Sequence, residues 1–198
     1  YLLARRVGGN TSCVAATGEA VLQKGSLLEA GTEILPFASQ EGVWTLQSMG
    51  DQWSIYGDGR ILDSLGGAIP GNWGTLDIGA GNNSTADLSD QILNGLRQED
   101  LDALYYDGRI PSSSEIDSVD PWFANADTGL SAGIQNAIEQ VHGSTKLVPI
   151  YDTVSGSGGN NVEFHIVAWG VVKVVGSGWN GSSNSYVTIQ KSYTYDSN

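Results

Sequence analysis

The chain has 198 residues, about the size of one domain, and its 40% hydrophobic content suffices for a buried core, which argues against wholesale disorder. It contains 9 Lys and Arg residues and 22 Asp and Glu residues, for a net charge of -13. Because such a surface repels phosphate groups and anionic lipids, we expect neither a nucleic-acid partner nor binding to an anionic membrane.

Short apolar runs separated by glycines dominate the first 69 residues, and this pattern predicts strands joined by turns. The runs lie at residues 14–16, 19–22, 33–37 and 43–46. We interpret residues 1–69 as a β-rich N-terminal lobe or extension. Residues 70–79 read PGNWGTLDIG, which predicts a turn, a short strand and a second turn before a loop rich in Gly and Asn.

A first helix is predicted after this loop. Leu88, Ile92 and Leu96 recur every four residues, the spacing of an amphipathic helix. Ser84 is suited to cap its N-terminus, and aspartates in the first turn complement the positive end of the helix dipole. Gly95 is expected to limit the helix at its C-terminal end.

Residues 97–126 are acidic and are predicted to be irregular. Aromatic residues cluster at 105–106 and 121–123, and we expect them to pack a loop against the core. A second helix follows, with Gly143 at the position of a C-terminal cap. Its apolar residues fall at three- and four-residue steps: Leu130, Ile134, Ala137, Ile138 and Val141.

The strongest predicted strands lie at residues 146–151 and 162–175. A loop of Ser, Gly and Asn, residues 155–161, joins them in a hairpin-like connection. Pro149 indicates an edge position or a bulge in the first strand. The second strand is almost entirely apolar from Ile166 onward, which predicts a central strand buried on both faces.

Residues 186–195 alternate polar and apolar side chains, the pattern of a half-buried terminal strand. Together these elements predict an α+β fold, mainly antiparallel β with two amphipathic helices. We place the main α+β domain at residues 70–198.

Few side chains in the chain are suited to catalysis. His142 and His165 are the two histidines, and the lone Cys13 can form neither an internal disulfide nor a thiolate zinc cluster. His165 shares a strand face with Glu163, whereas His142 ends a helix. No Gly-x-Ser-x-Gly elbow, His-Glu-x-x-His helix or P-loop accompanies them, so we interpret both histidines as structural and assign no catalytic residue.

Carboxylates are plentiful, and in so acidic a chain most of them must form a solvated face. They include Asp77, Asp87, Asp90, Asp100, Asp102, Asp117, Asp120 and Asp127. Their spacing does not match the EF-hand loop. A calcium site assembled from separate loops stays open, because such oxygen cages leave little trace in a sequence; no other cofactor is expected.

Two features bear on where the protein acts. No stretch approaches the roughly 18 apolar residues of a spanning helix, so no membrane span is expected in this chain. The chain opens at Tyr1 rather than Met, which predicts a processed product whose export signal lies upstream. With 27 Gly, 6 Trp and few lysines, its composition is similar to that of exported bacterial surface proteins, and we expect an extracellular or cell-surface location.

Two blocks of sequence carry a resemblance to a known family. The first is PGNWGTLDIG at residues 70–79, followed by the predicted helix, and the second runs from DTGLSAGI at 127–134 through VPIYD to FHIVAWG at 164–170. Together they resemble the C-terminal region of bacterial TadG-like proteins of Tad (Flp) pilus assembly, over about residues 70–175. The resemblance implies a structural role at the cell surface, beside other pilus subunits.

The GNWG segment is interpreted as a structural motif rather than an active site. Gly71 and Gly74 flank Trp73, which predicts a tight turn that places the large ring in the core. Asn72 and Asp77 complete the motif.

We therefore expect a non-enzymatic extracellular structural or adhesion subunit whose partners are copies of itself or other surface and pilus subunits, able to form filaments. Two alternatives stay open: a secreted carbohydrate-active hydrolase with paired carboxylates, and a calcium-dependent binding module. The predicted C-terminal strand, with Tyr186, Thr188 and Gln190 on one face, is the candidate assembly edge, because a polar terminal strand can pair with a neighbour.

Overall fold

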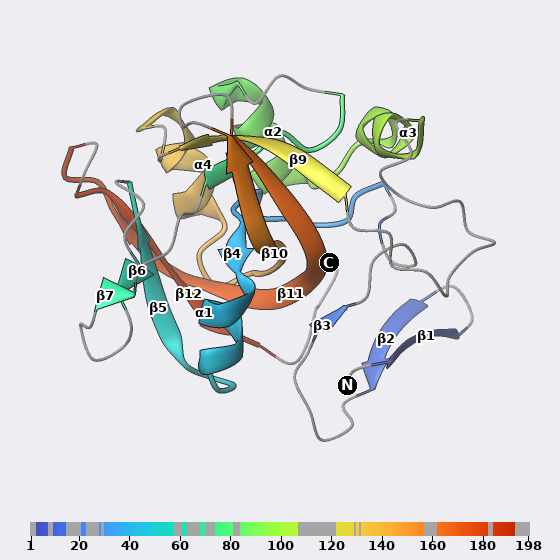
Figure 1. The fold of residues 1–198 in the computed structure, drawn as a ribbon, viewed down its shortest axis with the longest axis horizontal. Helices are drawn as coiled ribbons and strands as arrows, with labels where there is room; N and C mark the ends of the chain where they lie inside the picture. The colour runs from blue at the N-terminus through green and yellow to red at the C-terminus, as the bar shows by residue number, and fades with distance from the viewer. Residues whose placement is uncertain are drawn as a thin grey trace.

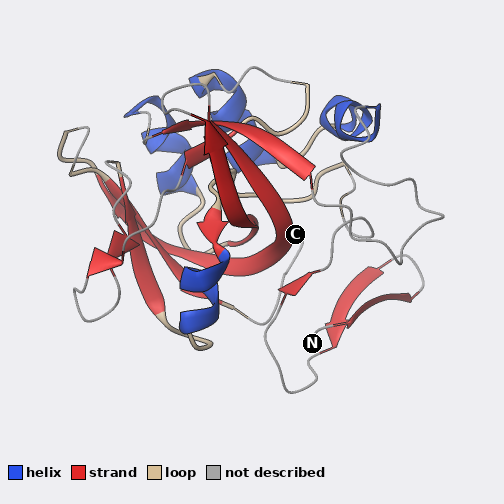
Figure 2. Cartoon of the chain, viewed as in Figure 1, coloured by secondary structure: helices blue, strands red, loops and turns tan. Residues whose placement is uncertain are grey.

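A long strand near the C-terminus, β11 (Val162–Gly178), organises the fold, which we describe from a computed structural model (Figure 1). The structure describes residues 3–7, 10–14, 21–22, 28, 30–57, 61–62, 68–69, 74–80, 84–106, 122–128, 130, 132–156, 162–181 and 184–192. These residues form a mixed, mostly antiparallel sheet with short helices packed against it (Figure 2), which confirms the predicted α+β class.

The other strands are β1 (Leu3–Val7), β2 (Asn10–Val14), β3 (Val21–Leu22), β4 (Ser39–Gln40), β5 (Gln52–Tyr56), β6 (Ile61–Leu62), β7 (Ala68–Ile69), β8 (Gly74–Leu76), β9 (Trp122–Thr128), β10 (Thr145–Gly156) and β12 (Tyr186–Lys191). The helices are α1 (Glu41–Leu46), α2 (Thr85–Asn94), α3 (Gln98–Tyr106) and α4 (Gln135–Gln140), the last preceded by a 3-10 turn at Ala132–Ile134. β1 and β2 form a separate two-stranded sheet.

β11 is a central strand, because strands bond to both of its sides. β10 pairs with it in antiparallel fashion on one side. On the other side β9, β3 and β12 follow one another along its length, and Figure 1 shows the strand bending strongly as it passes them. The prediction that the apolar run from Ile166 to Val175 forms a central strand is confirmed.

β12 lies inside the sheet, between β11 and β5. The expectation that the C-terminal strand is a free edge is therefore wrong, since hydrogen-bonded neighbours occupy both of its sides. The three residues proposed as the assembly face contact β5 and the turn before it. Tyr186 packs on Tyr56 with ring centroids 5.4 Å apart, Thr188 Oγ1 hydrogen-bonds Ser54 Oγ at 2.7 Å, and Gln190 Nε2 donates to a backbone carbonyl.

Part of the sheet closes into a small ring of hydrogen-bonded strands. β11 pairs with β9, and β9 pairs with β8. Residues 36–38 then bond to β8, with Leu76 N donating to Pro36 O at 2.9 Å and Ala38 N to Gly74 O at 3.2 Å. The chain continues directly into β4, which pairs in parallel with β10 and so completes the ring. Closure of this kind removes the free edges of these strands along the paired residues, which in β10 end at Tyr151.

Two apolar cores flank β10 and β11. One fills the ring, with side chains from β8, β9, β10 and β11 such as Leu76, Ala124 and Phe164. The other lies on the opposite face, where α1, α2 and α4 cover the strands. Neighbouring residues Val171 and Val172 belong to different cores, which explains why this part of β11 is apolar on both faces.

Both predicted helices are confirmed. The first is α2, and Ser84 Oγ caps it by accepting a hydrogen bond from Asp87 N at 3.2 Å. It ends at Gly95, whose φ is 74°. The second is the 3-10 turn with α4, and Gly143 follows it with a φ of 90°.

Two segments differ from the prediction. Residues 43–46, predicted as a strand, lie in α1, whose last carbonyls are satisfied from a distant part of the sequence: Lys191 Nζ donates to Trp44 O and Gln47 O, each at 2.9 Å. Residues 97–126, predicted as irregular, contain α3 and β9. β9 is a strand because β8 and β11 pair with it. This pairing is tertiary, so the sequence of residues 122–128 alone does not indicate it.

The predicted structural motif is only partly described. Gly71, Asn72 and Trp73 lie outside the described residues, so the burial expected for the Trp73 ring stays a prediction. Gly74 begins β8, and Asp77 follows that strand, with its N–H donating to a β9 carbonyl at 2.9 Å. Strands from both sides of the boundary predicted between residues 69 and 70 belong to the same sheet.

Gly79 is expected to tolerate substitution poorly, because it has a positive φ and no room for a side chain. At a φ of 92° an alanine is strained, and its Cβ would overlap the Cα and Cβ of Asp100. Gly143 has a similar φ of 90° but open space around it. In urea titrations we expect Gly143→Ala to lose roughly 1–2 kcal/mol of stability and Gly79→Ala clearly more. Equal losses would show that the contact with Asp100 contributes nothing.

Candidate functional site

A bulge in β10 sets two residues against one histidine of β11. The pairing register shifts after Tyr151, so that Asp152 is inserted before the pair formed by Thr153 and His165. Asp152 Oδ1 lies 2.6 Å from His165 Nδ1. Thr153 Oγ1 donates a second hydrogen bond to the same oxygen at 3.0 Å. The bulge thus directs a carboxylate at an imidazole on the outer face of the hairpin.

Phe123 of β9 completes this group from the other side. It is paired with His165 across the two strands, and their ring centroids lie 4.9 Å apart. The Phe123 side chain is 52% exposed, whereas that of His165 is 19% exposed. We call Phe123, Asp152, Thr153 and His165 the His165 face. It combines an exposed ring with a hydrogen-bonded carboxylate–imidazole pair on the outer side of three adjacent strands.

The His165 face has part of the geometry of a general base. A carboxylate at Nδ1 fixes the imidazole and leaves Nε2 for a reacting proton, as in a Ser-His-Asp triad. Within the described part of the chain, no Ser or Cys hydrogen-bonds His165, so a nucleophile is missing from the group. His142 lies elsewhere, where its Nε2 contacts Ser177 Oγ at 3.0 Å.

Stability should depend on the Asp152 carboxylate in a defined pH range. Burial alone would raise the pKa of Asp152, but the hydrogen bonds from His165 and Thr153 outweigh it and hold the pKa below its ordinary value of 3.8. A carboxyl whose pKa falls on folding stabilises the protein above the unfolded pKa, and this is lost as the pH drops through the folded one. Asp152→Asn should therefore be less stable than the wild type at pH 7, with the difference shrinking below pH 3.8.

Urea unfolding of the wild type and of Asp152→Asn at pH 7 and about pH 3 measures this dependence. Asp102→Asn is the matched control, because Asp102 is an exposed carboxylate elsewhere on the surface. A stability difference between wild type and Asp152→Asn that does not change with pH would mean that the Asp152 pair does not contribute through its charge.

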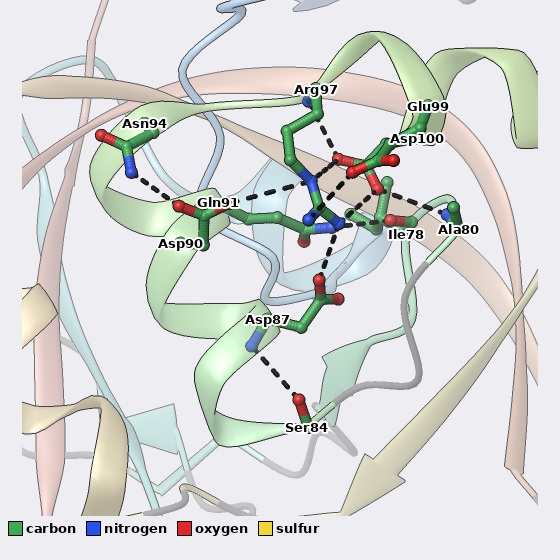
Figure 3. Close-up of polar contacts among 10 residues, drawn as sticks. All are labelled: Ile78, Ala80, Ser84, Asp87, Asp90, Gln91, Asn94, Arg97, Glu99 and Asp100. Atoms are coloured by element: carbon green, nitrogen blue, oxygen red, sulfur yellow. Dashed lines mark hydrogen bonds and ion pairs between the residues drawn. The ribbon is translucent and has the colours of Figure 1, made fainter.

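A second polar group gathers four carboxylates around one guanidinium (Figure 3). We call it the Arg97 cluster: Asp87, Asp90, Arg97, Glu99 and Asp100. The guanidinium nitrogens lie 2.9 Å from Asp87, 3.8 Å from Asp90, 3.1 Å from Glu99 and 3.1 Å from Asp100. It joins Asp87 and Asp90 of α2 to the start of α3.

Asp100 is the buried anchor of this cluster. Its side chain has 0% exposure, and its two oxygens accept four hydrogen bonds. These come from Arg97 N at 2.9 Å, Arg97 Nε at 3.2 Å, Arg97 Nη2 at 3.1 Å and Ala80 N at 3.3 Å. Asp100 therefore holds the start of α3 and the segment after β8 together, and it is an exception to the solvated carboxylates expected from the sequence.

The charges of the Arg97 cluster are mutually dependent. Hydrogen bonding to Asp100 raises the pKa of the Arg97 guanidinium. Burial raises the pKa of Asp87, with Asp100 and Asp90 acting in the same direction and Arg97 against them. Since a guanidinium occupies the space between the carboxylates, they do not form the open acid–base pair that a glycosidase needs.

Two negative observations apply to the part of the chain that the structure describes. It contains no group of three or more His, Cys, Asp or Glu side chains arranged to hold a metal ion. It also contains no helix of the length and apolarity needed to cross a membrane, in agreement with the expected absence of a span.

His165 was noted in the sequence because it shares a strand face with Glu163, but Asp152 and Phe123 were not associated with it. Asp152 reaches His165 through a bulge, and Phe123 reaches it through pairing between distant strands. The one local signal was Pro149, which indicated a bulge or an edge in this strand.

Comparison with protein-family models, with curated proteins and with solved structures gave no match for this chain.

Proposed function

We propose that this chain is a non-enzymatic extracellular structural or adhesion subunit that acts by contact with copies of itself or with other surface subunits. One observation carries the proposal: within the described residues, the end of β10 combines an exposed apolar side chain with an unpaired strand edge. Val154 on this edge is 41% exposed, and Phe123, on β9 at the other side of β11, is a second exposed apolar side chain at 52%. Exposed apolar groups beside an unpaired edge are features of contact surfaces.

The open edge is residues 152–156 of β10. Toward the start of β10, Ile34 forms a bridge with Leu147, and β4 pairs with Ile150 and Tyr151. From Asp152 onward, β11 is the one strand that pairs with β10 within the described residues. This edge takes the place of the C-terminal strand as the candidate assembly contact.

The buried ionisable groups support a structural role. Lys146 Nζ donates to a carbonyl near the end of α2 at 2.9 Å and pairs with Glu33 at 3.0 Å. Lys191 Nζ likewise donates to a carbonyl in the last turn of α1. Asp100 anchors the Arg97 cluster. These charges stabilise helix ends and loops and are removed from solvent. The resemblance to TadG-like proteins supports the same role.

Negative-stain microscopy of the purified chain tests this proposal. We expect filaments or regular oligomers, favoured by salt or calcium because either screens the acidic surface. Single small particles in all of these conditions would contradict it. An effect of calcium well beyond that of equal ionic strength would favour the calcium-dependent binding module instead.

The alternative is a secreted carbohydrate-active hydrolase, and the Asp152–His165 pair is the observation that favours it. The pair resembles half of a catalytic triad, with Nε2 of the imidazole available to take a proton. Release of reducing sugars from oligosaccharides, abolished in His165→Ala and unchanged in His142→Ala, would support turnover. Equal background release of reducing sugars by the wild type, His165→Ala and His142→Ala would contradict the hydrolase alternative.

A further inference from the structure

The open edge of β10, residues 152–156, is electrostatically distinct from the rest of this acidic protein. Thr153, Val154, Ser155 and Gly156 carry no charge. The one charge, Asp152, is turned toward His165 and bonded to it at 2.6 Å. Two copies with a net charge of -13 each repel one another, but here their backbones can approach without placing acidic side chains face to face.

We propose that this edge pairs with the same edge of a second copy, in antiparallel fashion, across a twofold axis at Val154. This inference rests on the proposed function, since it specifies the contact through which the chain assembles. A twofold contact uses the same surface on both molecules, so the edge must be complementary to itself. The sequence of residues 152–156 meets that condition in the register centred on Val154.

In this register Val154 lies opposite Val154 of the second copy, because 154 is the centre of the five residues. Thr153 then lies opposite Ser155, and Asp152 lies opposite Gly156. Directly opposed residues in an antiparallel pair have Cβ atoms about 5 Å apart, so the two valines cover each other and each Thr can hydrogen-bond a Ser. In this register no carboxylate lies opposite another carboxylate. A register centred on Asp152 would place the two Asp152 side chains opposite each other.

The exposure of Val154 fits this arrangement. It is paired with Phe164, which is fully buried in the ring core, yet Val154 itself is 41% exposed because no strand lies beyond it among the described residues. A second copy of β10 would extend the sheet at this point and cover the exposed part of the side chain. Strand addition of this kind is a common mode of protein association.

Charge substitutions at Val154 test the twofold register. Val154→Glu and Val154→Lys each place two like charges opposite one another, and each is expected to weaken self-association by about tenfold or more. An equal mixture of the two variants should restore association, because Glu then lies opposite Lys. Leu46→Glu is the matched control, since it adds the same charge at a side chain that is 75% exposed on α1. Sedimentation velocity measures association in each case.

Cross-linking gives a second measurement that does not depend on tolerance of a charge. In a Cys13→Ser background, Val154→Cys should form a disulfide-linked dimer on mild oxidation, because opposed residues in an antiparallel pair lie close enough for a disulfide. Leu46→Cys in the same background should remain monomeric on a denaturing gel.

The outcomes separate this inference from the proposed function. If the wild type associates and Val154→Glu associates equally well, the β10 contact is wrong and the proposed function stands. If both charge variants fail and their mixture also fails, with no cross-linking through position 154, the twofold register is wrong. If the wild type does not associate at all, the inference and the proposed function fail together.

Discussion

Replacing Lys191 with methionine is expected to lower the free energy of unfolding by roughly 2–4 kcal/mol, because two buried carbonyls lose the ammonium donor and Trp44 O keeps the longer bond from Gln47 N at 3.3 Å. Lys191 is 1% exposed, and its Nζ donates to Trp44 O and Gln47 O, each at 2.9 Å. The ammonium group also lies 4.6 Å from the Trp44 ring centroid, a cation–π contact. Methionine keeps most of the volume but cannot donate a hydrogen bond.

Lys173 provides the control for this substitution. It lies exposed on β11, so Lys173→Met removes the same charge and should change stability by about 0.5 kcal/mol or less. Urea unfolding followed by tryptophan fluorescence compares the variants, and Trp44 is itself close to the substituted group. A Lys191→Met protein as stable as Lys173→Met would show that the end of α1 does not need this cap.

Replacing Asp100 with alanine is expected to destabilise the protein by about 2–5 kcal/mol, as removal of one partner from a buried charged network does. The change leaves the N–H groups of Ala80 and Arg97 and one side of the guanidinium without their shared acceptor. The four carboxylates of the Arg97 cluster become three, and the guanidinium remains for Asp87, Asp90 and Glu99.

Asp102→Ala is the matched control in the same helix. Asp102 is exposed and accepts a single hydrogen bond from Gln98 Nε2 at 2.8 Å, so we expect a loss of roughly 0.5 kcal/mol or less. Thermal unfolding by circular dichroism distinguishes the two variants. Similar melting temperatures for Asp100→Ala and Asp102→Ala would contradict the assignment of Asp100 as the buried anchor.

The sequence predicted those elements whose signals are local. α2 has a capping serine, a four-residue apolar spacing and a terminal glycine within its own segment, and β11 has a long apolar run. α1 was predicted as a strand because residues 43–46 are apolar and β-prone, whereas the Lys191 side chain that satisfies its last carbonyls comes from the opposite end of the chain.

The sites were harder to predict than the elements, for the same reason. The sequence gives no sign that Asp152 bonds His165, because a one-residue bulge decides which β10 side chain faces the imidazole. The polar, alternating pattern of residues 186–195 predicts a free edge, and residues 186–191 of this segment form β12. In the structure it marks a strand with one buried face, since β5 from the N-terminal half covers the side that a terminal strand would leave open.

The proposed function requires that the chain associates with copies of itself, and the proposed contact is the edge of β10 at residues 152–156, whose one charged residue is Asp152. Light scattering coupled to size-exclusion chromatography tests it most directly, with protein concentration and salt varied independently. We predict a molar mass that rises above that of the monomer with concentration, and rises further with salt, because salt screens the repulsion between chains of net charge -13. A monomer mass at every concentration and salt condition would contradict the account.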